Sequence, residues 1–332
     1  MEKIMLNRFL FLTLICCLIV SNAFGQDGLY KDKETQSLFL LPLGYDFFYF
    51  NDQTVHNPAF GAGFMIGKSD IPFTEIERYF FGIALYRPVF FSDVPVNNIP
   101  KTLHQSEAIF DGRINRHQLL FIYNGASDKP VAGGLNTFNA GAGWGYQIIR
   151  KEQLSLVLGA VLGVGGFLNS VPLLPLPVVR FGIRSQWFVS SFDFVTGPNW
   201  EFTIAPKKKI RLTADLRMDY YRSIDDIICE IILWYRFFGA DHKLGDFAGI
   251  GLGFKNDSID FSFSDNLAGK TGIDLFEFKY KSVFAKLDLS LLIIEGGWTF
   301  DSQYSLDGIK TKSPGTGFYL SVQGTVPIKM KR

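Results

Sequence analysis

The amino-acid sequence predicts an all-β fold, a transmembrane antiparallel up-and-down β-barrel of about 12–16 strands, where even numbers are expected. Three observations predict it: an export segment at the N-terminus, an alternation of apolar and polar residues with a period of two, and the length over which that alternation holds. A period of two sends successive side chains to opposite faces of a strand. Strands of roughly 9–11 residues cross a bilayer obliquely.

The N-terminus carries the features of a secretory signal peptide. Lys3 and Arg8 form a short positive region, and Phe9–Val20 is an uncharged apolar run, shorter than the roughly 20 residues that a transmembrane helix needs. Small residues at Ala23 and Gly25 stand where a signal peptidase reads the chain. We therefore expect residues 1–25 to be cleaved and residues 26–332 to form a single barrel domain.

The cysteines raise one alternative, a lipoprotein anchored through Cys16 or Cys17. Ile15 stands before Cys16 where a small residue is required, and both cysteines lie inside the apolar run, so we favour the cleaved signal peptide. After cleavage Cys229 is the remaining cysteine of three. An intramolecular disulfide is then excluded, and the exported chain must be stabilised in another way.

Composition excludes some classes of partner. Cleavage removes Lys3 and Arg8 from 33 basic residues and Glu2 from 32 acidic ones, so the mature chain is formally neutral. Neutrality gives no field that would steer nucleic acid toward the protein. Aromatic residues make up 16% of the chain, with 34 Phe and 33 Gly, while 20% of residues are charged. Apolar residues are spread along the chain in alternation rather than gathered in long buried segments.

Three segments show the alternation best. In Phe138–Ile148 the even positions are apolar or aromatic, and the odd positions are Asn, Gly and Gln. In Arg211–Tyr220 one face carries Arg, Thr, Asp, Arg and Asp, and the other face is apolar. Val283–Ile294 places Lys286, Asp288 and Ser290 on one face. Such strands suit a barrel that faces lipid outside and water inside. A soluble sandwich also alternates, but its strands are usually about 5–6 residues long.

We expect the remaining strands at Leu38–Phe50, Phe60–Lys68, Arg78–Phe91, His117–Asn124, Leu154–Phe167, Val178–Ser191, Trp200–Ala205, Ile227–Phe238, Phe247–Lys255, Ser258–Ser264, Ile273–Tyr280, Gly297–Tyr304 and Gly317–Ile328. The polar stretches 150–153 and 206–209 predict tight hairpins. The longest gap, Ser92–Arg116, contains Pro95, Asn97, Asn98 and Pro100 and is predicted to be an external loop.

Leu154–Val179 offers an alternative, because it is a run of 26 residues without a charge that a hydropathy scan would read as a transmembrane helix. Gly159 and Gly163 even show the spacing that lets helices pack closely. Pro172, Pro175 and Pro177 interrupt the second half, and β-patterned chain lies on both sides. We therefore favour a strand over Leu154–Phe167 followed by a proline loop.

No motif assigns a catalytic, cofactor-binding or metal-binding residue, and the sequence predicts no enzyme and no cofactor. The glycine runs at 141–145 and 249–253 do not complete a nucleotide-binding motif, and we interpret them as sites of strand curvature or close approach. No pair of the four histidines has the spacing of a metal site. His56, His104 and His242 are expected in loops, and His117 at the start of a strand. The aromatic clusters at 47–50, 79–81 and 235–238 are interpreted as interfacial belts.

Taken together, the signal peptide, the three alternating segments and the aromatic clusters resemble those of bacterial outer-membrane β-barrel proteins. The stretch Leu174–Val178, which leads into alternating strands, looks like that of some uncharacterised barrel families. The resemblance covers nearly the whole mature chain through generic features. It implies an outer-membrane location reached by the general secretory route, with outer-membrane lipid and the barrel-assembly machinery as partners, and no nucleic acid. One feature departs from the pattern: such barrels commonly end on an aromatic residue, whereas this chain ends Ile328-Lys-Met-Lys-Arg332.

The resemblance implies a passive role, either porin-like diffusion of small solutes or a structural one. Two alternatives stay open. A surface adhesin or partner-binding barrel would act through Ser92–Arg116. A lipid-acting outer-membrane enzyme would use His117, which lies near Asn115 and Gln118 at the mouth of a strand.

Overall fold

The computed structural model describes residues 37–51, 53–67, 78–93, 99–130, 134–151, 153–165, 174–194, 198–218, 227–237, 248–264, 268, 274–311 and 313–329. The predicted signal peptide, residues 1–25, lies outside these ranges. Asp219, Tyr220 and His242 also lie outside them, as do residues 330–332 at the C-terminus.

Across the described residues the chain forms one antiparallel sheet of 17 strands. The strands are β1 (Ser37–Phe50), β2 (Gln53–Gly67), β3 (Arg78–Phe91), β4 (Thr102–Ile114), β5 (His117–Ser127), β6 (Phe138–Lys151), β7 (Leu154–Gly165), β8 (Leu174–Arg184), β9 (Phe188–Phe194), β10 (Pro198–Ile204), β11 (Ile210–Met218), β12 (Ile227–Arg236), β13 (Gly249–Ser262), β14 (Leu275–Asp288), β15 (Leu292–Leu306), β16 (Ile309–Lys310) and β17 (Gly315–Lys329). A short 3-10 helix, η1 (Leu135–Thr137), precedes β6.

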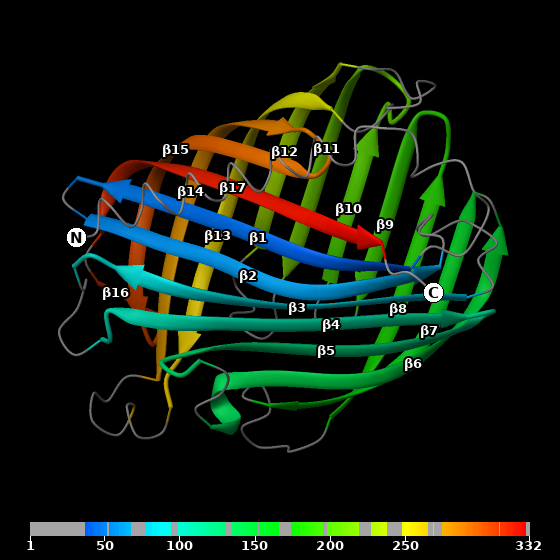
Figure 1. Ribbon diagram of the computed structural model, residues 1–332, viewed down its shortest axis with the longest axis horizontal. Helices are drawn as coiled ribbons and strands as arrows, with labels where there is room; N and C mark the ends of the chain where they lie inside the picture. Colours follow the sequence, from blue (N-terminus) through cyan, green and yellow to red (C-terminus); the bar gives the residue numbers. More distant parts are fainter. Residues whose placement is uncertain are drawn as a thin grey trace.

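The sheet closes into a barrel, as predicted. Neighbours in sequence pair with each other, β15 also pairs directly with β17, and β17 pairs with β1. The two-residue β16 pairs with β15 alone, so 16 of the 17 strands form the wall. Figure 1 shows the closure, with β1 in blue beside β17 in red. Because each wall strand has a partner on both sides, the wall has no open edge, which a sheet needs when it is surrounded by lipid.

The cross-strand register separates an apolar outer face from a lumenal face. Leu233 and Leu252 lie opposite each other on β12 and β13 and are 53% and 64% exposed. Trp298 of β15 shares this outer face and is 53% exposed. The faces predicted for Phe138–Ile148 and Arg211–Tyr220 are confirmed over the described residues: Trp144 points outward, while Asp215 pairs with the lumenal Glu230.

The two ends of the barrel differ in their connections. At one end, which we name the turn end, most hairpins are short: 115–116, 152–153, 185–187, 205–209 and 289–291, beside the longer 68–77 and 237–248. The described barrel also begins and finishes there, at Ser37 and Lys329. At the opposite end, the loop end, most connections are longer, such as 92–101, 128–137, 263–274 and 307–314, beside the short 51–52 and 195–197. Outer-membrane barrels have the same asymmetry, with short turns toward the periplasm.

Several predicted boundaries were wrong. Ser92–Arg116 is not an external loop, because β4 occupies Thr102–Ile114 and pairs with both β3 and β5. The predicted strand Val178–Ser191 is two strands, β8 and β9, joined at Ser185–Trp187. The predicted pair Phe247–Lys255 and Ser258–Ser264 is the single strand β13. The predicted break near 281 is wrong, since β14 runs unbroken through it to Asp288. The predicted strand Val283–Ile294 is also wrong as a single strand, because the turn 289–291 separates the end of β14 from the start of β15.

The uncharged segment Leu154–Val179 is β-structure where the structure describes it. Leu154–Gly165 is β7, which confirms the predicted strand. Pro175 and Pro177 do not form a loop, because they lie within β8. Pairing of β8 with β9 begins only at Val179, so both prolines lie where β8 has a single partner, β7. Among the described residues, no helix has the length and hydrophobicity of a membrane span.

Candidate functional site

Polar side chains line the lumen in rows, along which residues of neighbouring strands lie opposite one another. The register places Glu295, Ser321, Asp46 and Asn57 directly opposite one another on β15, β17, β1 and β2. Farther round the wall, Glu107, Asn124 and Asn139 are opposite one another on β4, β5 and β6. Residues that are directly opposite across strands lie about 5 Å apart. These two lumenal rows form the first half of a set of polar side chains that runs around the lumen and that we describe as a ring.

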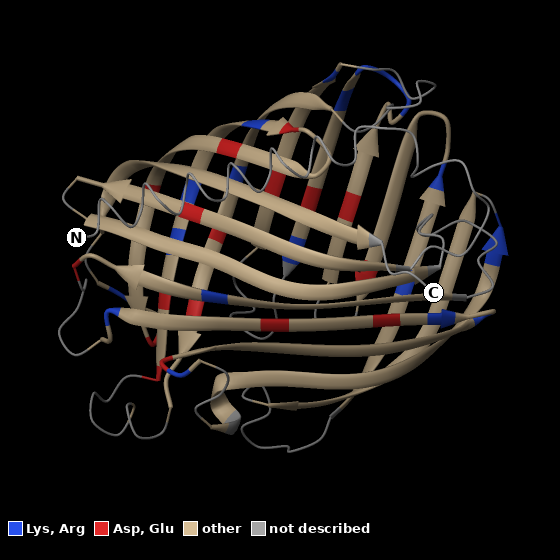
Figure 2. Ribbon diagram, in the orientation of Figure 1, with Lys and Arg blue, Asp and Glu red and all other residues tan. Residues whose placement is uncertain are grey.

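The other half of the ring comes from β10 to β14. Glu201, Asp215, Glu230 and Lys255 are opposite one another on β10, β11, β12 and β13. Lys286 of β14 lies opposite Glu295 and completes the set, four residues along β14 from Ser282, which lies opposite Lys255. Figure 2 shows acidic residues on neighbouring strands of this part of the wall. We name the complete set the polar ring.

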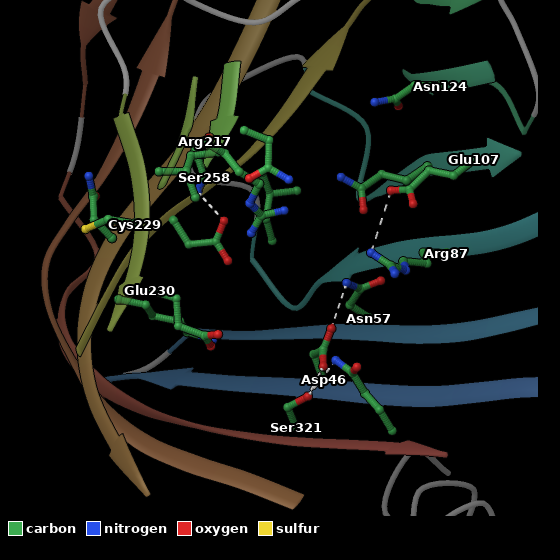
Figure 3. A pocket seen from close by; sticks show the side chains of 18 of the residues that line it. Asp46, Asn57, Arg87, Glu107, Asn124, Arg217, Cys229, Glu230, Ser258 and Ser321 are labelled. Atoms are coloured by element: carbon green, nitrogen blue, oxygen red, sulfur yellow. Dashed lines mark hydrogen bonds and ion pairs between the residues drawn. The ribbon is translucent and has the colours of Figure 1, made fainter. Parts of the chain in front are cut away.

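The polar ring surrounds a cavity of about 580 Å³. Its charged lining residues are five carboxylates and four cations: Asp46, Glu107, Glu230, Asp257 and Glu295, with Arg87, Arg217, Lys255 and Lys286. Figure 3 shows these groups on two facing walls, with Asp46, Asn57, Arg87 and Glu107 on one side and Arg217 and Glu230 on the other. A space of this size is comparable to the roughly 300–1,000 Å³ of small-molecule sites.

Most of these charges are paired with a neighbour in the ring. Asp46 accepts hydrogen bonds from Ser321 Oγ at 2.6 Å and from Asn57 Nδ2 at 3.2 Å. Arg87 and Glu107 form a looser ion pair, with 3.7 Å between nitrogen and oxygen. The ring therefore presents both signs of charge to the cavity and cancels much of each.

The most tightly held charges are on β13, β14 and β15. Lys255 Nζ lies 2.7 Å from Glu295 Oε1, and Lys286 Nζ lies 3.1 Å from Glu295 Oε2. Tyr319 donates a further hydrogen bond to Glu295 Oε1 at 2.6 Å. Lys286 also pairs with Glu230 at 3.2 Å, and Lys255 Nζ lies 4.3 Å from the centre of the Tyr319 ring. Glu295, which is 5% exposed, is thus shared by two ammonium groups.

A second ionic cluster lies on the lumenal face nearer the turn end. Asp111 of β4 pairs with Arg113 and with Arg180 of β8, each at 3.1 Å, and accepts a hydrogen bond from Gln118 at 2.8 Å. Arg180 also pairs with Asp193 of β9 at 2.7 Å. Because Arg180 and Asp111 come from strands that are not neighbours, this cluster ties separate parts of the wall together.

Inward-facing aromatic residues pack against each other across the lumen, most of them on the loop-end side of the polar ring. We name this cluster the aromatic plug; its buried members are Phe48, Phe50, Val55, Val89, Phe91, Ile99, Leu103, Ile232, Trp234, Phe261, Phe263, Phe276, Phe278, Tyr280, Phe284, Tyr304 and Tyr319. Phe91 of β3 meets Phe276 of β14 edge-on, with ring centres 5.8 Å apart. These two strands are five strands apart along the wall, so the contact spans the lumen.

Hydrogen bonds connect the segment that follows β13, which contributes Phe263 to the plug, to residues between β5 and β6 on the opposite side of the barrel. Asp128, just after β5, accepts from Ser264 N at 2.8 Å and from Ser264 Oγ at 2.9 Å. Asn136 of η1 donates to the Phe263 carbonyl oxygen at 2.9 Å. Because β5 and β13 are eight strands apart in a wall of 16, these bonds join opposite sides of the barrel mouth.

The plug is one-sided. Among the described residues, none of its members comes from β6 to β11. On the lumenal face of β6 and β7 the wall is instead lined by glycines: Gly141, Gly143, Gly145, Gly159 and Gly163. These glycines permit a close approach, as the sequence predicted, since a Cβ on Gly143 would lie 2.3 Å from Val161 Cγ2.

The predicted interfacial belts divide between the two faces of the wall. Tyr49 is 40% exposed on the outer face, but Phe48 and Phe50 point inward and belong to the plug. In the cluster at 79–81, Tyr79 is likewise buried on the inward face. The interpretation of each cluster as one belt was therefore wrong, because neighbouring residues on a strand face opposite ways.

The three histidines that the structure describes lie on the outside of the wall. His56 and His104 are on β2 and β4 rather than in loops, and their Nδ1 atoms are 2.6 Å and 2.7 Å from the hydroxyls of Tyr45 and Tyr86. His117 begins β5, as predicted, and accepts a hydrogen bond from Trp144 Nε1 at 3.2 Å. The rings of Trp144 and Tyr146 flank it, which places it in an aromatic patch of the exterior.

Sequence reasoning named no site residue, although the polar ring left some trace in the sequence. Lys286 and Asp215 were assigned to polar faces, and both point into the lumen. Glu295 and Asp46 each stand as a single charge inside an apolar run, and this isolation was the available signal. Within the described ranges, no group of three or more metal-ligating side chains is close enough to hold an ion.

No protein-family model matches the chain. A search of the curated proteins finds no match either. Among solved structures, the chain is similar to OccAB3 of Acinetobacter baumannii, with a TM-score of 0.38 and 11% identity over 90% of this chain and 100% of that chain. It is also similar to OprD of Pseudomonas aeruginosa, with a TM-score of 0.38 and 10% identity over 90% and 96%. The similarity to OpdQ of the same species has a TM-score of 0.35 and 10% identity, over 90% of this chain and 100% of that chain.

Proposed function

We propose that this chain is an outer-membrane β-barrel that lets small polar solutes diffuse through its lumen. The observation that carries the proposal is the 580 Å³ cavity inside the polar ring, together with a plug that leaves the β6–β11 wall without a contribution. Charges of both signs line the cavity, and this supports a lumen that holds water, because removing charges from water is costly even when they are paired.

Location and export belong to the same proposal. The outer face is apolar over membrane-spanning strands, which supports lipid as its surroundings. Residues 1–25 would direct the chain through the general secretory route and be removed, leaving residues 26–332 as the barrel. In this arrangement the turn end faces the periplasm and the plug lies toward the outside.

The test is single-channel conductance of the purified barrel in a planar bilayer, with liposome swelling in sugars of increasing size. We expect discrete conductance steps and a sharp size limit. Heat-modifiable migration on a gel provides the control, because it shows that the barrel in the bilayer is folded. A folded barrel with no conductance above the bare bilayer contradicts diffusion.

The aromatic plug favours a second candidate, a barrel with a structural role and a closed lumen. Its contacts cross the lumen, and residues such as Phe276 and Phe278 have no exposed surface. A folded, non-conducting barrel would support this candidate. The adhesin alternative loses the loop on which it was based, since most of Ser92–Arg116 is the wall strand β4.

A further inference from the structure

We infer that Glu295 sets the charge selectivity of the lumen by neutralising Lys255 and Lys286. The inference rests on the proposed diffusion function and names the residue that decides which solutes pass. Glu295 faces the cavity from β15, between the two lysines of β13 and β14.

The geometry makes Glu295 the central partner of this group. Each of its oxygens pairs with a different lysine, at 2.7 Å and 3.1 Å. Lys286 has a second carboxylate, Glu230, at 3.2 Å. For Lys255, the partners recorded besides Glu295 are aromatic rings, with Tyr319 4.3 Å away. Loss of the Glu295 charge would therefore remove the carboxylate that forms the ion pair with Lys255, while Lys255 still lines the cavity.

The numbers of positive and negative groups that line the cavity are so nearly equal that the loss of one charge should change the ion preference of the lumen. Five carboxylates and four cations line the cavity, an excess of one negative charge, so the wild-type lumen should prefer cations weakly. Replacing Glu295 by the similarly shaped Gln removes one carboxylate and gives four of each. The lysines are then exposed to permeating ions without their shared counter-charge.

The size of the effect follows from Coulomb's law. A unit charge about 7 Å from an ion in water changes the ion's energy by roughly RT. A salt concentration of 0.1 M reduces this to about half, since the Debye length is then about 10 Å. Because cations and anions respond with opposite sign, the anion-to-cation permeability ratio of Glu295→Gln should rise about three- to sevenfold.

The experiment measures reversal potentials in a KCl gradient for four variants beside the wild type. Glu295→Gln should shift the ratio toward anions, and Lys255→Met should shift it toward cations by a similar factor. The double variant should return to within about twofold of the wild type, since it removes one charge of each sign. Asp301→Asn is the matched control, because it removes one carboxylate from an ion pair with Lys281 on the outer face. Its ratio should not change.

The possible results separate this inference from the proposed function. If the wild type conducts and both Glu295→Gln and Lys255→Met keep its permeability ratio, the assignment to Glu295 is wrong while diffusion stands. A folded wild type without conductance overturns both. Should Glu295→Gln fail to give a heat-modifiable barrel, the shift of Lys255→Met alone decides, and a shift toward anions would overturn the inference.

Discussion

Substitution of Val283 by Arg is expected to destabilise the barrel far more than the same substitution at Asn124. Val283 lies near the middle of β14 on the outer face, is 50% exposed, and has Phe254 and Trp298 as its cross-strand neighbours. Asn124 of β5 lines the cavity beside Glu107. An Arg side chain would face lipid at the first position, and water and a carboxylate at the second.

The magnitude follows from the position of Val283. Arg on the lipid face costs about 2–4 kcal/mol at the bilayer midplane. Since half of the Val283 side chain is exposed, we take the lower limit, about 2 kcal/mol, which is roughly a 30-fold change in the folding equilibrium. At Asn124 we expect a change within about 0.5 kcal/mol.

The assay is reversible urea unfolding of the barrel in lipid vesicles, followed by tryptophan fluorescence and by heat-modifiable migration. The free energy of unfolding should fall by about 2 kcal/mol for Val283→Arg and stay near the wild-type value for Asn124→Arg. Equal losses at the two positions would refute the assignment of β14 and β5 faces to lipid and lumen.

Three further perturbations test the plug and the glycine wall. Phe91→Ala removes the aromatic contact across the lumen, so the free energy of unfolding should fall by about 3 kcal/mol and the conductance should rise. Phe90→Ala, on the outer face, is the control. An equal conductance of the two variants would contradict the plug. Asp128→Ala removes both hydrogen bonds to Ser264, and frequent brief openings in single-channel records are expected where the wild type is steady. Gly159→Ala places a Cβ 2.1 Å from the Trp144 carbonyl oxygen and should reduce the yield of folded barrel, whereas Gly296→Ala, whose nearest contact is 3.8 Å, should fold normally.

The fold was predictable where the two faces of a strand differ strongly. Around Phe138–Ile148 one face is aromatic and the other is glycine, and both the strand and its orientation were predicted. β4 was missed because both of its faces are mixed: Gln105 and Asp111 face the lumen beside Leu103 and Ile109. Without a contrast between faces, a period of two leaves no signal in the sequence.

The plug and the polar ring could not be predicted for related reasons. Phe48 and Tyr49 are neighbours of similar hydrophobicity, and only the position of the barrel axis decides which of them enters the lumen. Asn256 and Asp257 resemble a turn, yet they continue β13, where Asp257 accepts a hydrogen bond from Tyr280. The partners of Glu295 come from strands whose register is fixed only when the sheet closes.

The seam between β1 and β17 joins the first and last strands of the wall, with 13 residue pairs from Leu38–Lys329 to Phe50–Gly317. Until the final strand has been delivered, β1 has an unsatisfied ladder of amides and carbonyls on one side, and so does the growing opposite edge. The two exposed strand edges would pair with other chains in water and would be unstable in hydrocarbon. Assembly of this protein therefore depends on something that shelters both borders until they meet, and a chain that stops before Gly315 would remain an open, association-prone sheet.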